Sequence, residues 1–200
     1  MTNIKIGRLL RAGTSGFVVG CRVSQLEVPS FGALVKVPLD NQYQIFGLIH
    51  DIHVDDDGLV RQLVVADDVA ENIIIDNRLN RIVPLEMNVL SIGYSQGEET
   101  YHLLPPRPPL SLDEVYLCDQ QELVQFTSVG RFGYFRHILR SSELPVGEIL
   151  AAHLAQTRSA QKAFGDKDWF EKSTQELITL LRDDYATLMN VLGAIADLRN

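Results

Sequence analysis

Residues 130–140 combine basic and aromatic side chains in a way that permits binding chemistry. The segment reads GRFGYFRHILR, with three arginines, three aromatic residues and no acidic residue. Aromatic rings stack on exposed bases and arginines neutralise phosphates, so this mixture is typical of surfaces that bind single-stranded nucleic acid. The residues that would make such contacts are Arg131, Phe132, Phe135, Arg136 and Arg140.

An ordinary amphipathic helix also explains this segment. On a helix, Phe132, Phe135 and Leu139 lie on one side, as a ring face packed into a core would. Arg136 and Arg140 lie on another side, one turn apart. We therefore expect core packing with an exposed basic edge that receives an acidic partner protein, with nucleic acid as the alternative. The net charge of -8 works against nucleic acid, because an acidic protein repels phosphate backbones.

The histidines form no recognisable catalytic or metal-binding pattern. His50 and His53 stand three residues apart in an expected strand, so they point to opposite faces and cannot chelate one metal ion together. Asp51 and His53 share a face. An enzyme with a site between two parts of the chain, using His102 or His137, stays an alternative. We predict no catalytic residue, no metal and no cofactor.

A phosphate-binding loop is missing from the sequence. Such a loop needs glycines, a lysine and a hydroxyl in the pattern G-x-x-x-x-G-K-[ST], which does not occur here. Lys172 is followed by Ser173, but Glu171 precedes them inside a predicted helix. The turn at residues 13–16 carries no lysine and connects two strands. These observations favour a protein that is not an enzyme.

Composition is typical of a folded protein inside the cell. The 200 residues are 46% hydrophobic and 22% charged, which is enough to bury a core. The two cysteines, Cys21 and Cys118, are far apart and suggest no disulfide framework. The chain has no apolar run long enough for a signal peptide or a membrane span. We expect a cytoplasmic protein without a membrane segment.

The first half of the chain has the pattern of short strands. Apolar runs rich in branched residues alternate with turns, and six or seven such strands favour a closed barrel, because closure removes exposed edges. Asp57-Gly58 predicts a hairpin with a solvated acidic tip, joining a strand at Phe46–Val54 to one at Val60–Val65. An irregular stretch around Pro84 precedes the last two strands.

A proline cluster divides the chain. Proline removes backbone donors and favours an extended backbone, so neither a helix nor an inner strand is expected to cross Pro105–Pro109. We predict a β-barrel domain at residues 1–104, a linker at residues 105–112 and a helical domain at residues 113–200. The fold class is α+β in two segments, an all-β barrel followed by an all-α domain.

Beyond the prolines the apolar period is helical. The predicted helices are Asp119–Phe126, Arg131–Arg140, Pro145–Lys162 and, as one long helix or two in line, Asp168–Leu198. Asp168 and Glu171 resemble a capping box at the start of the last segment. Its leucine stripe is expected to pack against its own domain or, as an alternative, to mediate self-association.

Several segments resemble a known barrel domain. Pro29–Gly32 leads into Leu34–Val37, and Ile45–Ile52 follows after a turn. These residues resemble the HAS-barrel, the amino-terminal domain of HerA-type DNA-translocating ATPases and of the catalytic-ring subunits of F-type ATP synthases. Tyr101–Pro106 resembles the end of that domain. The likeness covers about the first half of the chain, and Gly47–Val65 is also similar to the PRC-barrel.

The resemblance implies a role in assembly. In that family the barrel does not hydrolyse nucleotide but helps to assemble subunits and offers a surface to partner proteins. The motor that should follow is replaced by fewer than 100 residues of predicted helix without a phosphate loop, so ATP hydrolysis, DNA translocation and hexamer formation are not implied. We predict a non-catalytic assembly or docking module that binds a partner protein or itself.

Overall fold

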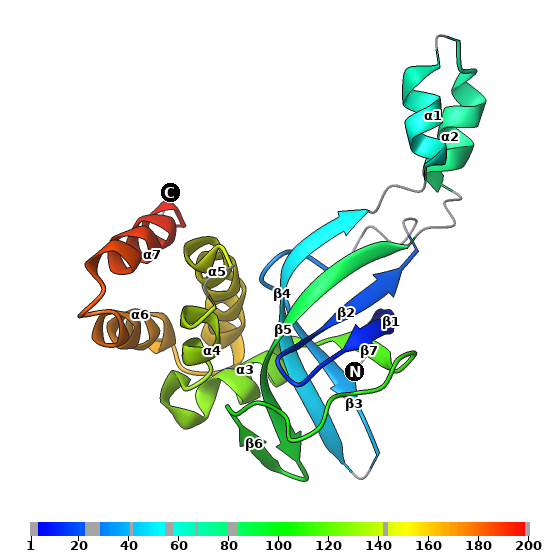
Figure 1. Ribbon diagram of the computed structural model, residues 1–200. Coiled ribbons are helices and arrows are strands. Elements are labelled where there is room, and N and C mark those ends of the chain that lie inside the picture. The colour runs from blue at the N-terminus through cyan, green and yellow to red at the C-terminus, as the bar shows by residue number, and fades with distance from the viewer. Residues whose placement is uncertain are drawn as a thin grey trace.

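The computed structural model has three parts. Figure 1 shows a barrel of strands, a group of helices against one side of it, and a pair of helices that stands away from both. The described residues are 4–22, 29–40, 42–54, 58–66, 68–79, 84–141 and 144–198.

One antiparallel sheet forms the barrel. Its strands are β1 (Lys5–Ala12), β2 (Gly16–Cys21), β3 (Leu34–Pro38), β4 (Tyr43–Val54), β5 (Leu85–Gln96), β6 (Glu99–Tyr101) and β7 (Glu114–Leu117). The strand order is β2-β1-β7-β3-β4-β5-β6, and β2 also pairs with β5. Six strands therefore form a closed ring, with β6 added to β5. The predicted closed barrel is confirmed.

Strand β4 explains why the barrel carries helices on one side. Tyr43, Ile45 and Ile49 belong to the apolar cluster inside the barrel. Phe46 and Leu48, which alternate with them, belong to a second cluster shared with the helices. Because successive side chains of a strand point to opposite faces, a strand that is apolar at both sets of positions must be covered on both faces.

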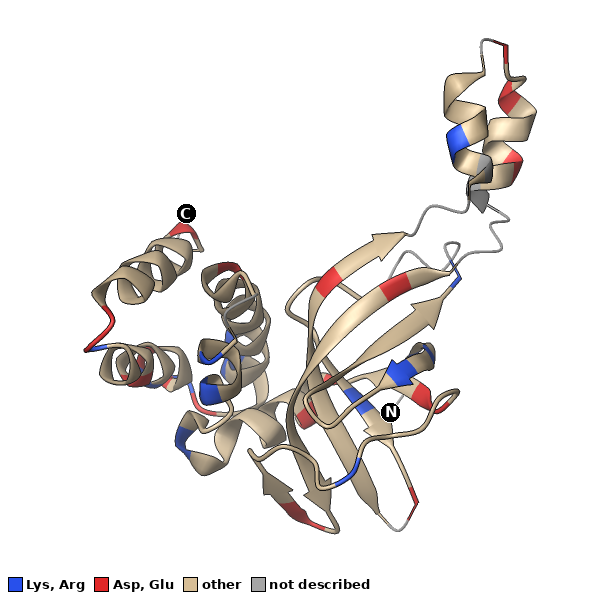
Figure 2. Ribbon diagram, in the orientation of Figure 1, with Lys and Arg blue, Asp and Glu red and all other residues tan. Residues whose placement is uncertain are grey.

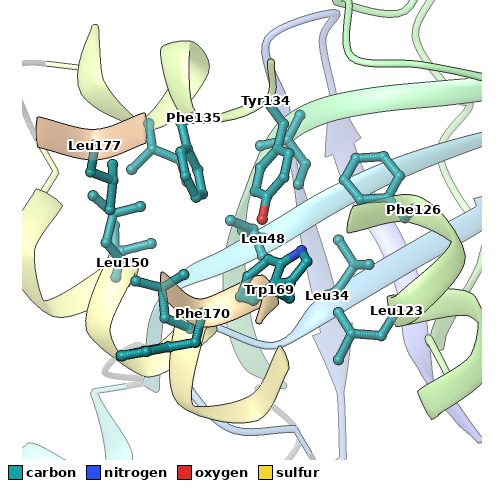
Figure 3. Close-up of a cluster of buried hydrophobic side chains, with 14 of the residues drawn as sticks. Leu34, Leu48, Leu123, Phe126, Tyr134, Phe135, Leu150, Trp169, Phe170 and Leu177 are labelled. Atoms are coloured by element: carbon teal, nitrogen blue, oxygen red, sulfur yellow. The ribbon is translucent and has the colours of Figure 1, made fainter. Parts of the chain in front are cut away.

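The covering helices follow β7 in the sequence. They are α3 (Gln120–Ser128), the 3₁₀ turn Gly130–Phe132, α4 (Phe135–Leu139), α5 (Val146–Phe164), α6 (Trp169–Leu180) and α7 (Tyr185–Asp197). Figure 3 shows Phe126, Tyr134 and Phe135 packed in the cluster that also holds Leu48 of β4. Each of the three rings is at most 1% exposed. The predicted α+β arrangement, barrel first and helices second, is confirmed.

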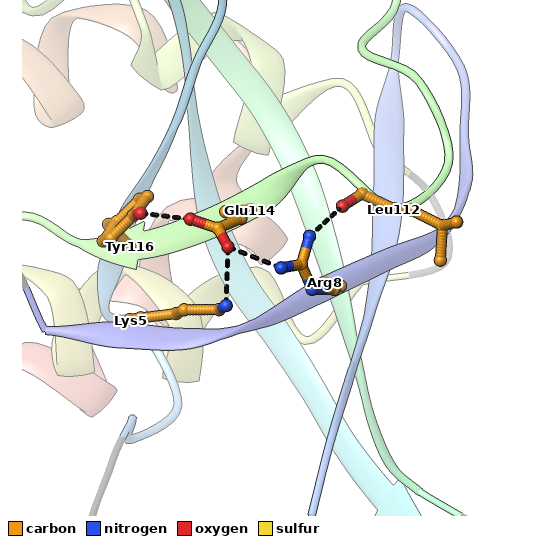
Figure 4. A network of polar contacts seen from close by, with 5 residues as sticks. All are labelled: Lys5, Arg8, Leu112, Glu114 and Tyr116. Carbon is orange, nitrogen blue, oxygen red and sulfur yellow. Dashed lines mark hydrogen bonds and ion pairs between the residues drawn. The ribbon is translucent and has the colours of Figure 1, made fainter.

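Strand β7 corrects the expectation that residues 113–200 are all helical. It lies beyond the prolines and pairs with β1 and β3, so the sheet extends past residue 104 to residue 117. Lys5 Nζ and Arg8 Nη2 each lie 2.6 Å from Glu114 Oε1, and Tyr116 Oη donates to Oε2 at 2.5 Å (Figure 4). These contacts, that of Lys5 foremost, lower the pKa of Glu114 to about 2. Four residues are too few to display a period of two, which is why the sequence pattern missed this strand.

Two short helices replace the predicted hairpin after β4. We call α1 (Leu59–Val65) and α2 (Glu71–Leu79), together with the described residues between them, the arm. The predicted strand at Val60–Val65 is wrong, because this run forms α1 after Gly58, whose φ is 74°. A short apolar run fits a strand and a helix equally well, and the partner of β4 as far as Val54 is β5. The acidic tip at residues 55–57 lies outside the described residues.

Two predicted helices are broken. Arg131 and Phe132 have φ values of 45° and 58°, so the basic-aromatic segment forms a tight turn and the short α4 instead of one helix. The last segment forms α6 and α7, and Figure 1 shows the chain turning between them, so they are not in line. The side chain of Asp168 makes no capping hydrogen bond. The capping box is formed instead by Asp119 and Glu122 at the start of α3.

Candidate functional site

The aromatic residues of the basic-aromatic segment lie in the protein core. Phe135 is buried, and the ring of the half-buried Phe132 stacks on it with 5.5 Å between centroids. Phe132 also meets Trp169 of α6 edge to face at 5.6 Å. Stacking on nucleic-acid bases requires rings that are open to solvent. In the folded state Phe135 is buried and does not meet this requirement. One face of the Phe132 ring is covered by Phe135.

The three arginines of this segment have different surroundings. Arg136 is half-buried and donates a hydrogen bond from Nη2 to the carbonyl oxygen of His102. Arg131 and Arg140 are exposed, and neither makes an ion pair within the described ranges. Figure 2 shows basic residues in this region of the helices. The basic edge at the surface therefore consists mainly of Arg131 and Arg140.

His102 holds three elements together. Its Nε2 donates to the carbonyl of Phe126 in α3 at 3.0 Å, and its ring meets Phe126 and Tyr134 with centroids 4.7 and 5.0 Å apart. Its own carbonyl, just after β6, accepts from Arg136 and from His137 Nε2 at 3.1 Å. Burial lowers the pKa of His102 to about 4, so the ring is neutral at pH 7. Such contacts are those of a structural residue.

His153 of α5 is also neutral and buried. Its Nε2 lies 3.1 Å from Tyr134 Oη and 3.4 Å from Thr157 Oγ1. Burial lowers the pKa of His153 to about 4.

The structure brings His102 and His137 together through the main chain of His102, and in the described part of the chain neither ring is hydrogen-bonded to a serine or cysteine. The arrangement at His102 and His137 therefore lacks the paired nucleophile and base that covalent catalysis uses.

A cleft that is not lined by these histidines lies between the barrel and the helical part. Its volume is about 410 Å³, which is within the range of small-molecule sites. Apolar walls come from β2 and β5 and from Leu144, which precedes α5. The polar lining residues are Arg11, Ser15, His50, Asn88 and Ser141.

A β-bulge explains the place of His50 in this cleft. Along β4, Ile49 pairs with Val89 and Asp51 pairs with Asn88, so His50 is the extra residue between two partners. Bulges re-aim side chains, and they are frequent beside functional sites. Burial lowers the pKa of His50, which keeps its ring uncharged near neutral pH. The sequence analysis considered His50 only as a metal ligand beside His53 and did not place it in a cleft, because a bulge cannot be seen in one strand alone.

The other polar groups of the cleft are partly engaged. Asn88 Nδ2 donates to Asp51 Oδ2 at 3.0 Å, and the same oxygen lies 2.8 Å from His53 Nδ1, as expected for two residues on one face of a strand. Arg11 Nη2 lies 3.5 Å from Glu86 Oε2. The cleft thus offers hydroxyls, an amide, an imidazole and the guanidinium of Arg11. These groups can form hydrogen bonds with a polar ligand.

The arm is a different kind of candidate. None of its described side chains is buried, and Val64 and Val65 are 77% and 79% exposed. The three consecutive isoleucines of α2, Ile73, Ile74 and Ile75, are each 42–48% exposed. The arm stands off the barrel on the side away from α6 and α7 (Figure 1). It offers exposed apolar surface, which suits contact with another protein.

Metal ligands do not gather in the described ranges: no three His, Cys, Asp or Glu side chains there are placed to hold one ion. None of the helices described has the length and apolar character that crossing a bilayer requires. No protein-family model matches this chain, and no curated protein matches it either.

Proposed function

We propose that this protein is a non-catalytic assembly module, in which the barrel and its covering helices form a base and the arm binds a partner protein or a second copy. The observation that carries the proposal is the exposed apolar surface of the arm.

The helices of the arm are too short to be stable as isolated helices. Its helices have seven and nine residues, and isolated helices shorter than about 12–15 residues are marginal in water. Ile73, Ile74 and Ile75 follow one another at about 100° per residue, so their side chains spread over about 200° of the helix circumference. A helix that is apolar on more than one side is usually buried. We infer that the arm is covered from more than one side when the protein is in its complex.

The barrel supports the same role through the resemblance seen in the sequence. A closed six-stranded antiparallel ring with an added strand agrees with the HAS-barrel that Pro29–Gly32 and Ile45–Ile52 indicate. We propose that the chain carries this domain without the ATPase motor. In that family the barrel joins subunits and receives partners, and the arm between β4 and β5 would supply the contact here.

The test combines light scattering after gel filtration with affinity purification from the native cell. The test variant is Ile73→Ser/Ile74→Ser/Ile75→Ser, and the matched control is Leu110→Ser/Leu112→Ser, which replaces two leucines that are 72% and 68% exposed outside the arm. We expect the native protein to form an oligomer or to retain a specific partner. The arm variant should lose that association, and the control should keep it.

Two results would contradict the proposal. One is a native protein that is a monomer and retains nothing. The other is an association that survives the arm variant unchanged. A positive result also shows whether the arm binds a second copy or a partner protein. Self-association raises the mass measured for the purified protein, whereas a partner protein appears only in material purified from the cell.

A further inference from the structure

We propose that the helical part contains a binding site for an oxyanion, a carboxylate or a phosphate, carried on an apolar group. The site is a pocket of about 330 Å³ where α5, α6 and the end of α7 meet. It is distant in sequence from the arm and does not depend on the proposed assembly role. Its lining residues are Ala155, Arg158, Ser159, Lys162, Phe170 and Leu198.

Two cations and no acidic residue are among the residues that line the pocket. Arg158 and Lys162 are four residues apart on α5, so they lie on the same face of that helix. No lining residue is acidic, and in the described part of the chain neither cation makes an ion pair. Like charges at this spacing oppose each other. An anion bound between them would remove that repulsion.

The guanidinium of Arg158 is held in place for such a ligand. Its carbon lies 4.7 Å from the centroid of the Phe170 ring, which is 3% exposed. This cation–π contact restricts the position of the guanidinium. An oxyanion accepts hydrogen bonds from a guanidinium in a bidentate geometry.

The other walls of the pocket determine which kind of ligand would carry the anionic group. Phe170 and the half-buried Ala155 and Leu198 are apolar, and the Ser159 hydroxyl is the one uncharged polar side chain among the residues that line the pocket. A free inorganic anion would leave the apolar walls uncovered. A ligand with an apolar chain next to its oxyanion would contact both parts, and the pocket volume is at the lower end of the range for small-molecule sites.

The experiment is a titration of the full ¹⁵N-labelled chain, followed by amide chemical shifts. Four probes separate the contributions: hexanoate, hexyl phosphate, the neutral hexanamide, and acetate. We expect at least one of the two hexyl anions to give saturable shifts at Arg158, Lys162, Phe170 and Leu198. Hexanamide and acetate should each bind at least about tenfold more weakly, because the first lacks the charge and the second the apolar chain. Comparison of the two hexyl anions shows whether the site prefers carboxylate or phosphate.

Substitutions test whether Arg158 and Lys162 bind the anionic probes. Lys162 is exposed, so Lys162→Gln should leave the fold intact and weaken binding of the anionic probe about tenfold. Arg158→Gln should do at least as much. Arg182→Gln, which removes an exposed arginine paired with Asp183, is the control and should leave the affinity unchanged. Three results would overturn the proposal: hexanamide binding as tightly as the hexyl anions, no saturable shift with either anion, or an unchanged affinity in Lys162→Gln.

Discussion

The molecule has two helical regions that follow barrel strands, and only one of them is packed against the barrel. Helices α3 to α7 bury Phe126, Tyr134 and Phe135 almost completely against the outer face of the sheet. In the arm, by contrast, none of the described side chains is buried, and Val64 and Val65 are among the most exposed apolar residues of the described chain. Figure 1 shows the two regions on different sides of the barrel.

The difference lies in what each helix packs against. In α5, Ile149, Leu150 and Leu154 are all fully buried, and α3, α4, α6 and α7 lie against this helix. The adjacent isoleucines of α2 spread over about 200° of the helix and are 42–48% exposed. The first pattern is that of a domain core and the second that of an interface.

The largest expected effect separates the two regions by stability. Phe135→Ala should lower the free energy of unfolding by about 3–5 kcal/mol, because it removes a fully buried ring and leaves a cavity. Ile74→Ala in the arm should lower it by less than about 1 kcal/mol. Urea denaturation monitored by fluorescence of the single tryptophan, Trp169, measures both, since that side chain is buried in the helical part.

Equal losses in these two variants would show that the comparison is wrong. They would mean that the arm unfolds together with the barrel and the helices as one cooperative unit, and that its isoleucines already contribute to the stability of the isolated chain. The proposal of an external partner for the arm would then lose its physical basis.

The second prediction concerns pH and the buried histidines of the packed region. Burial lowers the pKa of His153 from 6.5 to about 4 in the folded protein. Between these pH values the unfolded state binds a proton that the folded state does not. The stability from a neutral His153 is therefore complete above pH 6.5 and is lost as the pH falls to about 4. One pKa unit corresponds to 1.36 kcal/mol, so the loss approaches about 3 kcal/mol.

A variant identifies the source of this loss. In His153→Gln the fall in unfolding free energy between pH 7 and pH 4 should be clearly smaller than in the native chain. It should not vanish, because the pKa of His102 is lowered to about 4 by burial as well. Denaturation curves at a series of pH values give the two slopes. Identical slopes would mean that His153 is hydrated in solution and not enclosed as described.

The sequence predicted the packed parts of this molecule better than the site. Apolar alternation around Ile45–Ile49 predicted barrel strands, and the apolar period after the prolines predicted α3 and α5, because burial of one face repeats along a regular element. Strand β7 was missed because its pairing with β1 and β3 depends on residues more than 75 positions away. Its own four residues carry little pattern.

The candidate sites depend on features that a single sequence does not encode locally. His50 enters the cleft through a bulge, and a bulge is a relation between two strands. Arg158 was not considered, because its stacking on Phe170 joins two helices that the sequence shows separately. Arg136 was expected at a surface edge, yet it is half-buried and bonded to a carbonyl whose position depends on β6. Each case is a long-range contact, not a local preference.

The last prediction uses two glycines with nearly the same backbone conformation, Gly32 at φ 78° and Gly58 at φ 74°. A Cβ at Gly32 would lie 2.7 Å from the Ala152 Cβ and 2.9 Å from the His153 nitrogen, whereas a Cβ at Gly58 would meet nothing within 4 Å. Gly32→Ala combines the left-handed strain of about 1–2 kcal/mol with a clash against α5, so it should destabilise the protein by at least about 2 kcal/mol.

Gly58→Ala carries the same strain without the clash, and it acts at the start of the arm. If the arm is independent of the core, the unfolding transition seen by Trp169 should move by less than about 0.5 kcal/mol, while amide hydrogen exchange within residues 59–66 becomes faster. The two measurements on one variant therefore separate local from global stability. A loss of about 2 kcal/mol in the Trp169 transition of Gly58→Ala would show that the arm and the core unfold together, because backbone strain at the residue before α1 would then change the stability around a side chain in α6.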